Sequence, residues 1–307
     1  MKTIGILLAV LMLVGCQTNK IVVEKEIGLL DTVKERGYLV CGVNAGLPGF
    51  ASEDDEGNWS GLDVDFCRAV SAAVFGDADK VEYLGLNAAQ RFPTLASGSI
   101  DILSRNTTWT ISRDVNLMFE FAGVSYYDGQ GFLVPTDLGI TSARGLDGAF
   151  VCIASETTSE LNLNDYFAEN NMAYRPIYVE GNKDAKAKLF AGECDVFTTD
   201  ASGLASARAG ADNPDDWVVL PEIISKEPLG PLVRQGDQEW EDVVRWTLFA
   251  MINAEEMGIT SRNVDDLLAS QSKEVKRLLG VEGYMGPMLG LGMKFGYNII
   301  KQVGNYG

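Results

Sequence analysis

The segment Asn106–Asp114 (NTTWTISRD) gathers hydroxyl side chains and one arginine directly after a predicted strand. Arg113 presents a planar fork of N–H donors that matches a carboxylate, and the hydroxyls of Thr107 and Thr108 can add neutral donors. Such a cluster is suited to binding a small carboxylate. The alternative is that the hydroxyls cap a helix and that Arg113 pairs with a nearby acidic side chain at the surface. These residues alone leave both interpretations open.

Catalysis by an activated nucleophile has no support from the residues present. The chain contains no histidine that could serve as a general base or as a zinc ligand. No Gly-x-Ser-x-Gly elbow, dinucleotide fingerprint or P-loop follows a predicted strand. We therefore expect neither a cofactor nor a metal site, and any ligand of segment 106–114 is expected to be bound without a chemical step.

Acidic residues dominate the charge of the chain. Among 307 residues, 43 Asp and Glu stand against 25 Lys and Arg, so the formal net charge is −18. The phosphates of nucleic acids repel such a chain, and no nucleic-acid partner is expected. The hydrophobic fraction of 46% and the charged fraction of 22% are ordinary for a globular protein, and the length allows about two domains.

The first residues have the features of an export signal. Lys2 supplies a positive charge, Ile4–Val14 is apolar but short for a membrane span, and the tetrapeptide LVGC ending at Cys16 resembles a lipobox. A buried helix is the alternative, but the stretch lacks a polar face at helical spacing. We predict a signal peptide over 1–16, acylation of Cys16 as a membrane anchor, and a tether over 17–30. The mature protein is then expected in the periplasm or at the cell surface.

Four cysteines follow this signal: Cys41, Cys67, Cys152 and Cys194. An even count in an exported protein favours disulfides, and four cysteines can pair in three ways. We favour Cys41–Cys67 and Cys152–Cys194, because each bridge then stays within one half of the chain. Buried free thiols are the alternative.

Short β-type runs alternate with amphipathic helical stretches along most of the chain, which is typical of an α/β fold with largely parallel sheets. The predicted strands are 38–43, 81–86, 100–103, 132–135, 149–153, 174–178, 195–198 and 217–220. The predicted helices are 62–75, 157–169, 183–191 and 239–256.

Two pairs of segments echo each other. Residues 95–106 and 189–200 share the order helix end, glycine, strand and polar residues, and 37–41 resembles 148–152. The echoes predict two similar α/β lobes. Ligands bind beyond the carboxyl ends of strands in such sheets. Asn106 from one lobe and Asp200 from the other are therefore expected to line a cleft.

A set of short motifs extends from about Leu30 to the last residue, and each of them is weak by itself. They are 37–39, 61–65, 98–101, 107–113 and 198–200, together with 41–50, 221–231 and 303–307. The first five together resemble the polar-amino-acid periplasmic solute-binding proteins, bacterial solute-binding protein family 3. The last three look like the general L-amino-acid-binding branch of that family.

The resemblance implies a periplasmic binding protein-like type II fold, in which two α/β lobes are joined by a hinge of two crossings. By resemblance, the crossings fall near Leu133–Asp137 and Glu222–Lys226. Lobe 1 is then discontinuous, over 31–135 and 224–307, and lobe 2 covers 136–223.

The resemblance also implies the ligand contacts. Arg113 and Thr108 are expected to hold the α-carboxylate of an amino acid, helped by the helix start at Thr157 and Thr158. Asp200 is expected to pair with the α-ammonium, assisted by the carbonyl of Asn106. The side-chain pocket is expected to be lined by Asn44, Leu47 and Phe50.

The implied function is that of the binding component of an amino-acid ABC transporter, which is not an enzyme and whose partners are free L-amino acids and the permease subunits. We expect broad specificity for polar or acidic amino acids and a monomeric receptor. Arg105 either reaches an acidic ligand side chain or faces solvent. The alternatives are a dehydratase on the same fold and a ligand-sensing domain.

One position departs from the motif of the family. Glu156 stands before Thr157 where the family usually has glycine, and it brings an anion near the carboxylate site. It either points away from the site or weakens binding. The resemblance also implies a further C-terminal segment beyond Gly307.

Overall fold

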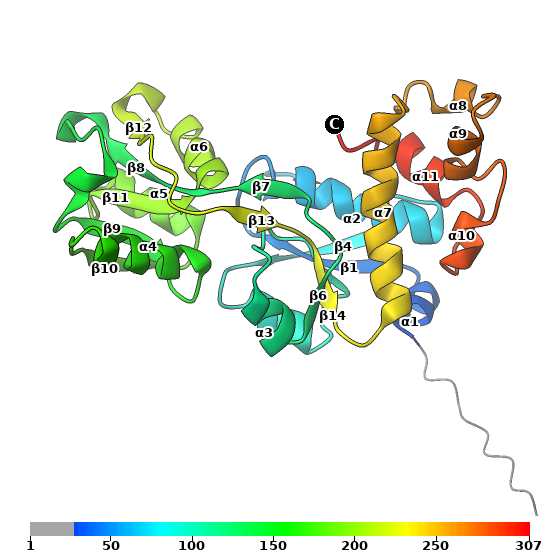
Figure 1. Cartoon of the computed structure of the whole chain (residues 1–307), viewed down its shortest axis with the longest axis horizontal. Coiled ribbons are helices and arrows are strands. Elements are labelled where there is room, and N and C mark those ends of the chain that lie inside the picture. The colour runs from blue at the N-terminus through cyan, green and yellow to red at the C-terminus, as the bar shows by residue number, and fades with distance from the viewer. Residues whose placement is uncertain (1–27) are drawn as a thin grey trace, which may run out of the picture.

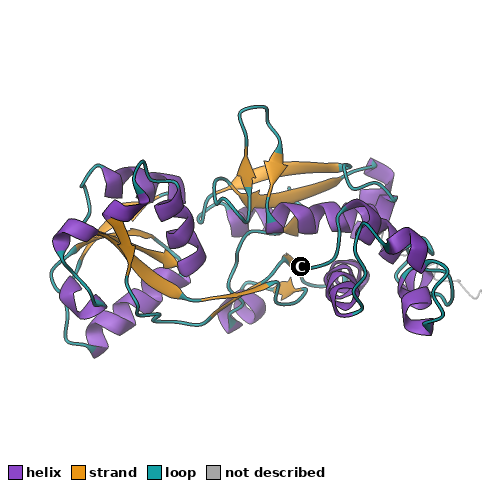
Figure 2. Ribbon diagram, turned by 90° about the horizontal axis from the view of Figure 1, so that it is seen from above, coloured by secondary structure: helices purple, strands orange, loops and turns teal. Residues whose placement is uncertain are grey.

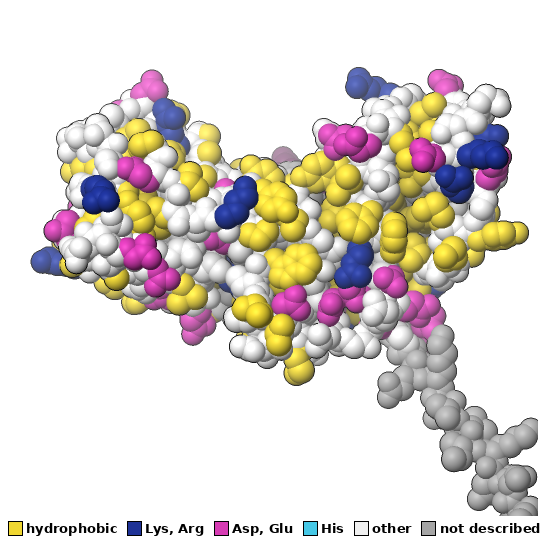
Figure 3. Space-filling model, viewed as in Figure 1, with side chains coloured by type: hydrophobic (Ala, Val, Ile, Leu, Met, Phe, Trp, Pro, Cys, Tyr) yellow, Lys and Arg dark blue, Asp and Glu magenta, His cyan; other side chains and the backbone are white. Residues whose placement is uncertain are grey.

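The computed structural model describes residues 28–307. The signal peptide, Cys16 and the tether as far as residue 27 lie outside this range. The chain forms two lobes side by side, joined by extended segments that carry β7 and β13 (Figure 1). Seen from above, the strands of the two sheets occupy separate lobes (Figure 2), and the space-filling view is hollowed between the lobes along its upper edge (Figure 3).

The sheet of the first lobe has the strand order β4-β1-β5-β14-β6. Strand β1 pairs in parallel with β4 and β5, whereas β14 pairs antiparallel with β5 and β6. The strands are β1 (Leu39–Asn44), β4 (Val81–Leu86), β5 (Ile102–Leu103), β6 (Phe119–Phe121) and β14 (Leu232–Arg234), and a small hairpin is formed by β2 (Ser52–Glu53) and β3 (Trp59–Ser60).

The sheet of the second lobe has the order β10-β9-β11-β8-β12. Its pairing repeats that of the first, with β9 parallel to β10 and β11, and β8 antiparallel to β11 and β12. The strands are β8 (Gln130–Pro135), β9 (Phe150–Ala154), β10 (Arg175–Val179), β11 (Val196–Asp200) and β12 (Trp217–Val219).

The matching order of the two sheets confirms the two similar lobes predicted from the echoes. Residues 95–106 and 189–200 occupy equivalent places, because they contain β5 and β11, the central strands of the two sheets. The expectation of largely parallel sheets needs a correction. Each sheet contains two antiparallel strand pairs, made by the strand that follows a crossing between the lobes: β14 in the first sheet and β8 in the second.

Helices cover both sheets and build the cores. In the first lobe α2, α7 and α11 pack on one another around a large apolar cluster that includes Val33, Val70, Trp240 and Ile299. The helices of this lobe are α1 (Leu29–Arg36), α2 (Leu62–Phe75), α3 (Arg91–Ala96), α7 (Gln238–Glu256), α8 (Val264–Leu267), α9 (Lys273–Leu278), α10 (Met285–Met288) and α11 (Phe295–Gln302), and those of the second lobe are α4 (Thr158–Glu169), α5 (Asn182–Phe190) and α6 (Ala201–Ala209). Helix α1 begins within the expected tether, which therefore ends before Leu29.

The hinge consists of β7 (Tyr126–Asp128) and β13 (Glu227–Leu229), which pair antiparallel between the lobes (Figure 1). The expected first crossing at Leu133–Asp137 falls too late in the chain, because β8 already belongs to the second sheet. Sheet membership thus assigns residues 130–135 to lobe 2, whereas the sequence placed them in lobe 1. We propose lobe boundaries at the hinge strands themselves.

Both favoured disulfides are present. Cys41–Cys67 joins β1 to α2, and Cys152–Cys194 joins β9 to the turn before β11. Each bridge ties an inner strand of a sheet to a neighbouring segment of the same lobe. Within residues 28–307, no helix has both the length and the apolar character needed to cross a bilayer.

Candidate functional site

A small cavity of about 60 Å³ lies between the lobes, at the carboxyl ends of the central strands. Such a volume holds a few water molecules. Residues of both lobes line it, namely Asn44, Ala88, Arg91, Arg105, Asn106, Thr108 and Arg113 from the first and Ala154, Thr157, Thr158, Ser159, Gly181, Asn182, Thr199 and Asp200 from the second. Seven of the ten ligand-binding residues predicted from the sequence are among them.

Arg113 lies on a short π-helical turn, Ser112–Asn116, after the end of β5. Its side chain is buried, and its Nη1 donates to the carbonyl oxygen of Thr108 at 2.8 Å while the guanidinium lies over the ring of Phe92. Burial lowers the pKa of Arg113 to about 10, against the opposing effect of the Glu227 and Asp200 charges. The group remains a cation, with N–H donors left over for a ligand carboxylate.

The second lobe meets Arg113 with the first turn of α4. Thr157 caps this helix, since its side chain accepts from the backbone N–H of Glu160, and the hydroxyl oxygen of Thr158 lies 3.4 Å from that of Thr108. The Thr108 hydroxyl also bonds to Glu227 of the hinge at 2.6 Å. A helix N-terminus presents unpaired N–H groups and the positive end of its dipole, which favour an anion. The Arg113 side of the cavity is therefore suited to a carboxylate.

Asp200 is the last residue of β11 and directly precedes α6, yet its side chain makes no capping bond to that helix. It is buried at 6% exposure and faces the cavity. Desolvation raises its pKa to about 7, and the charges of Asp128 and Glu227 add to this, while Asn106 and Arg91 lower it. A cationic group of a ligand would supply the counter-charge that this carboxylate lacks.

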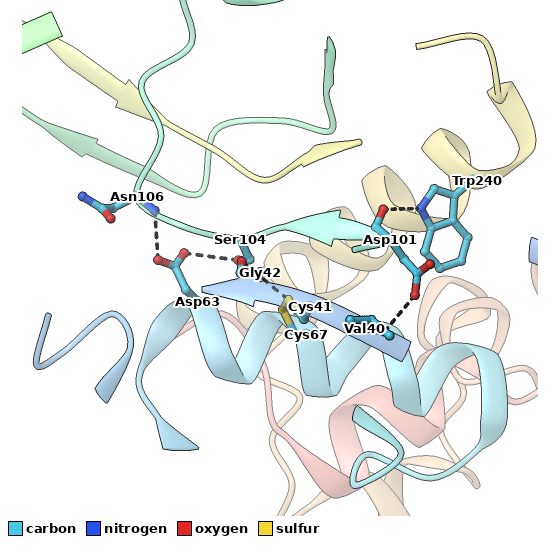
Figure 4. Close-up of a disulfide and its surroundings, with 9 residues drawn as sticks. All are labelled: Val40, Cys41, Gly42, Asp63, Cys67, Asp101, Ser104, Asn106 and Trp240. Carbon is cyan, nitrogen blue, oxygen red and sulfur yellow. Dashed lines mark hydrogen bonds between the residues drawn. A yellow bond between two sulfur atoms is a disulfide. The ribbon is translucent and has the colours of Figure 1, made fainter. Parts of the chain in front are cut away.

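Asn106 adopts φ 29°, which is uncommon for a residue other than glycine. Its backbone N–H donates to Asp63 at 3.0 Å (Figure 4). Its side-chain oxygen accepts from the side-chain amide of Asn44 at 2.9 Å. Asp63 lies in the first turn of α2. Gly61 directly precedes this helix, and a side chain there would collide with the backbone of Phe50. Burial raises the pKa of Asp63 to about 6, against the lowering effects of its hydrogen bonds from Asn106 and Ser104 and of the Arg105 charge. This network holds the strained turn open to the cavity.

Arg91 and Arg105 add further positive charge to the cavity. The sequence did not indicate Arg91 as a site residue. Both side chains are buried, and neither forms an ion pair with any acidic residue in the described part of the chain. The Nε of Arg91 has no hydrogen-bond partner among these residues, and its Nη1 reaches only Thr107 at 3.5 Å. Burial lowers the pKa of Arg91 well below its ordinary value and that of Arg105 to about 10. Arg91 starts the short helix α3 and carries no motif, so only the fold reveals it.

Three predicted residues are not on the cavity wall. Thr107 is fully buried and donates to the carbonyl of Arg105. Leu47 and Phe50 pack with Leu229 of the hinge in a small apolar cluster and are absent from the lining of this cavity, so their place in a side-chain pocket stays a prediction. Their burial explains the difference, because apolar side chains beside the hinge lose more by facing a polar cavity than by packing together.

Glu156 adopts φ 59° and is exposed. It is absent from the cavity lining, and its backbone N–H donates to the carboxylate of Glu160. Of the two alternatives for this residue, the structure favours the one in which the side chain points away from the site. Glutamate in place of the family's usual glycine at position 156 then lowers stability through backbone strain, because the position has a left-handed conformation.

Comparisons with known proteins agree on the kind of molecule. Residues 39–262 match the model of the bacterial extracellular solute-binding proteins, family 3. The chain is 56% identical over 280 residues to the general L-amino acid-binding periplasmic protein AapJ of Rhizobium johnstonii, covering 91% of this chain and 82% of that protein. It is 53% identical over 279 residues to the glutamate/glutamine/aspartate/asparagine-binding protein BztA of Rhodobacter capsulatus, with coverage of 91% and 82%.

A solved structure is similar in fold and sequence. It is an ABC transporter periplasmic binding protein from Brucella ovis with glutathione bound, 54% identical, with a TM-score of 0.89 and coverage of 91% of this chain and 88% of that one.

Proposed function

The chain belongs to the bacterial extracellular solute-binding proteins of family 3, and we propose that it captures free L-amino acids between its lobes and delivers them to the permease of an ABC transporter. One observation carries the proposal: Arg113 and Asp200 line the same cavity from opposite lobes. An amino acid carries a carboxylate and an ammonium on one carbon atom. The two buried side chains supply the complementary charges.

This division of the ligand between the lobes links occupancy to closure. The first lobe offers Arg113 and Thr108 to the carboxylate, and the second offers Asp200 to the ammonium and the start of α4 to the carboxylate. A ligand held at both sites stabilises the arrangement with the lobes together by its differential affinity. The permease can then distinguish the loaded receptor from the empty one by shape.

The side chain of the ligand is selected by Arg91 and Arg105. Both residues are buried and neither has a carboxylate partner in the described residues. An incoming carboxylate or amide oxygen would satisfy the Nε of Arg91, which otherwise remains unpaired. A cationic ligand side chain would meet like charges in a poorly hydrated site. We therefore infer a preference for glutamate, glutamine, aspartate and asparagine over arginine and lysine.

The relatives support this preference by their names. BztA is named for binding the same four amino acids, and AapJ is named as a general L-amino acid-binding protein. The Brucella ovis protein holds glutathione, whose γ-glutamyl end keeps a free α-carboxylate and α-ammonium. All three ligand descriptions are compatible with a site that grips the head group of an α-amino acid.

We propose further that this chain binds without chemical turnover, that it works as a monomer, and that an acyl group on Cys16 anchors it in the periplasm at a membrane. The first point is supported by the relatives, which are transport receptors. The anchor is supported by the lipobox-like sequence, which lies outside the described residues.

The test is calorimetry of the purified protein with single amino acids. Glutamate and glutamine are expected to bind with a dissociation constant near 1 μM, which needs about 8 kcal/mol. Arginine and lysine are expected to bind at least about tenfold more weakly. Mass spectrometry is expected to return the ligand unchanged. No heat and no thermal stabilisation with any standard amino acid would refute the proposal.

A matched pair of variants tests the selection step. Arg91→Gln is expected to weaken glutamate binding by about 10- to 100-fold, because it removes a buried cation, while Arg208→Gln, which removes an exposed arginine of α6, should leave binding unchanged. Equal affinities in the two variants would exclude Arg91 from the ligand site.

A further inference from the structure

A second, larger cavity of about 430 Å³ adjoins the ligand cavity. The two share Asn44, Arg105, Gly181 and Asn182 in their linings. The outer cavity extends from these residues along the loop after β4 and the N-terminal half of α5. It is therefore a continuation of the ligand site rather than a separate pocket.

The position of the shared residues gives the direction of the continuation. Arg113, Thr108 and Thr158, which form the carboxylate side, line the inner cavity alone. Arg105 lines both cavities and so marks the side of the inner cavity that continues into the outer one. An amino acid gripped at its head group therefore directs its side chain past Arg105. The inner volume of about 60 Å³ leaves little room there, so a long side chain must continue into the outer cavity.

The outer cavity is lined by groups that suit a peptide. Asn87, Gln90 and Asn182 offer amide donors and acceptors. Lys183 takes part in no ion pair among residues 28–307, because its neighbour Asp184 already pairs with Lys188 at 2.9 Å. The remaining charged side chain of the lining, Glu180, is exposed. A cation beyond a row of amides is complementary to peptide groups that end in a carboxylate.

We propose that this site also takes γ-glutamyl peptides, with the glutamyl head group in the inner cavity and the γ-linked residues in the outer one. The proposal rests on the amino-acid head-group site proposed above. Arg105 donates to the carbonyl oxygen of the γ-amide, and Lys183 faces the terminal carboxylate. An α-linked peptide is excluded, because its first peptide bond uses the carboxylate that Arg113 must hold, and N-acylation would remove the ammonium for Asp200.

The experiment compares three probes by calorimetry: glutamate, S-methylglutathione as a γ-linked tripeptide without a free thiol, and α-glutamylglycine. Glutamate and S-methylglutathione are expected to bind within about tenfold of each other, and α-glutamylglycine at least about 100-fold more weakly. If glutamate binds and S-methylglutathione does not, the peptide proposal is overturned and the amino-acid function still stands. Failure of both ligands overturns the amino-acid function as well.

A matched pair of variants on α5 locates the peptide. Lys183→Gln is expected to weaken the binding of S-methylglutathione by about two- to tenfold. It should leave the affinity for glutamate unchanged, because only the peptide reaches that end of the cavity. Lys186→Gln is the control, since Lys186 lines a different cavity and donates to the carbonyl of Gly210. Unchanged peptide affinity in Lys183→Gln, or an equal loss for both ligands, would overturn the placement in the outer cavity.

Discussion

The pH dependence of ligand affinity gives a sharp test of the role of Asp200. The pKa of this buried carboxyl is raised to about 7 in the unliganded protein, mainly by desolvation and then by the charges of Asp128 and Glu227. A ligand ammonium pairs with the ionised form only. Binding must therefore be strongest above this pKa and weaken as the pH falls through it, because the proton has to leave before the ammonium can be held.

The magnitude follows from the fraction of Asp200 that is ionised. Relative to a plateau above about pH 8, the dissociation constant for glutamine should rise about tenfold at pH 6 and about 100-fold at pH 5. Glutamine is the ligand of choice because none of its own groups titrates in this range. The assay is calorimetry at a series of pH values in buffers of matched ionic strength.

Two variants separate Asp200 from the other perturbed carboxyl near the site. Asp200→Asn should bind glutamine more weakly, by about 2–5 kcal/mol, and its affinity should be independent of pH in this range. Asp63→Asn removes a group whose pKa is raised to about 6, yet it should keep the pH dependence that Asp200 causes. A flat profile in the unmodified protein, or an unchanged slope in Asp200→Asn, would refute the reasoning.

The raised pKa of Asp200 also lowers the free energy of unfolding of the unliganded protein at neutral and higher pH. The folded pKa of Asp200 lies above its ordinary value of 3.8. The unliganded protein therefore binds the extra proton between the two values and loses stability as the pH rises through this window. The cost is on the order of 4 kcal/mol and is fully present above about pH 7. An ammonium ligand offsets it, so thermal stabilisation by glutamine should be greater at pH 8 than at pH 5.

Three further outcomes are expected. Arg113→Lys should weaken glutamine binding by about 10- to 100-fold in calorimetry, because an ammonium cannot replace the planar fork, and a change below twofold would contradict its role. Glu156→Gly should raise the free energy of unfolding in urea by about 1 kcal/mol by relieving the positive φ, and it should leave glutamine affinity unchanged; a tighter complex would show that Glu156 interferes after all. The double change of Cys152 and Cys194 to serine should lower that free energy by about 4 kcal/mol, given the 42-residue separation of the bridged cysteines, and an undiminished urea midpoint would rule out a stabilising bridge.

Local pattern was sufficient for most of the secondary structure. Helix α2 and strand β4 have the predicted bounds, because an amphipathic run between glycines and a short β-type run are both specified by neighbouring residues. The first crossing, expected by resemblance at Leu133–Asp137, lies too late in the chain because β8 pairs with β11 and β12, which are distant in sequence. Periodicity carries no information about which sheet such a strand joins.

The sequence by itself predicted the two charged residues proposed for the head group, since Arg113 and Asp200 follow or end echoing strand motifs. The structure places both on one cavity. Only the tertiary structure decided what surrounds them. Arg91 lines the cavity because it begins α3 beside it, whereas Leu47 and Phe50 pack in the hinge cluster. The burial of Asp200 and the charges around it come from residues far apart in the chain, and these two factors set its pKa. The strand ends that carry ligand groups are local features, but the space between two lobes is not.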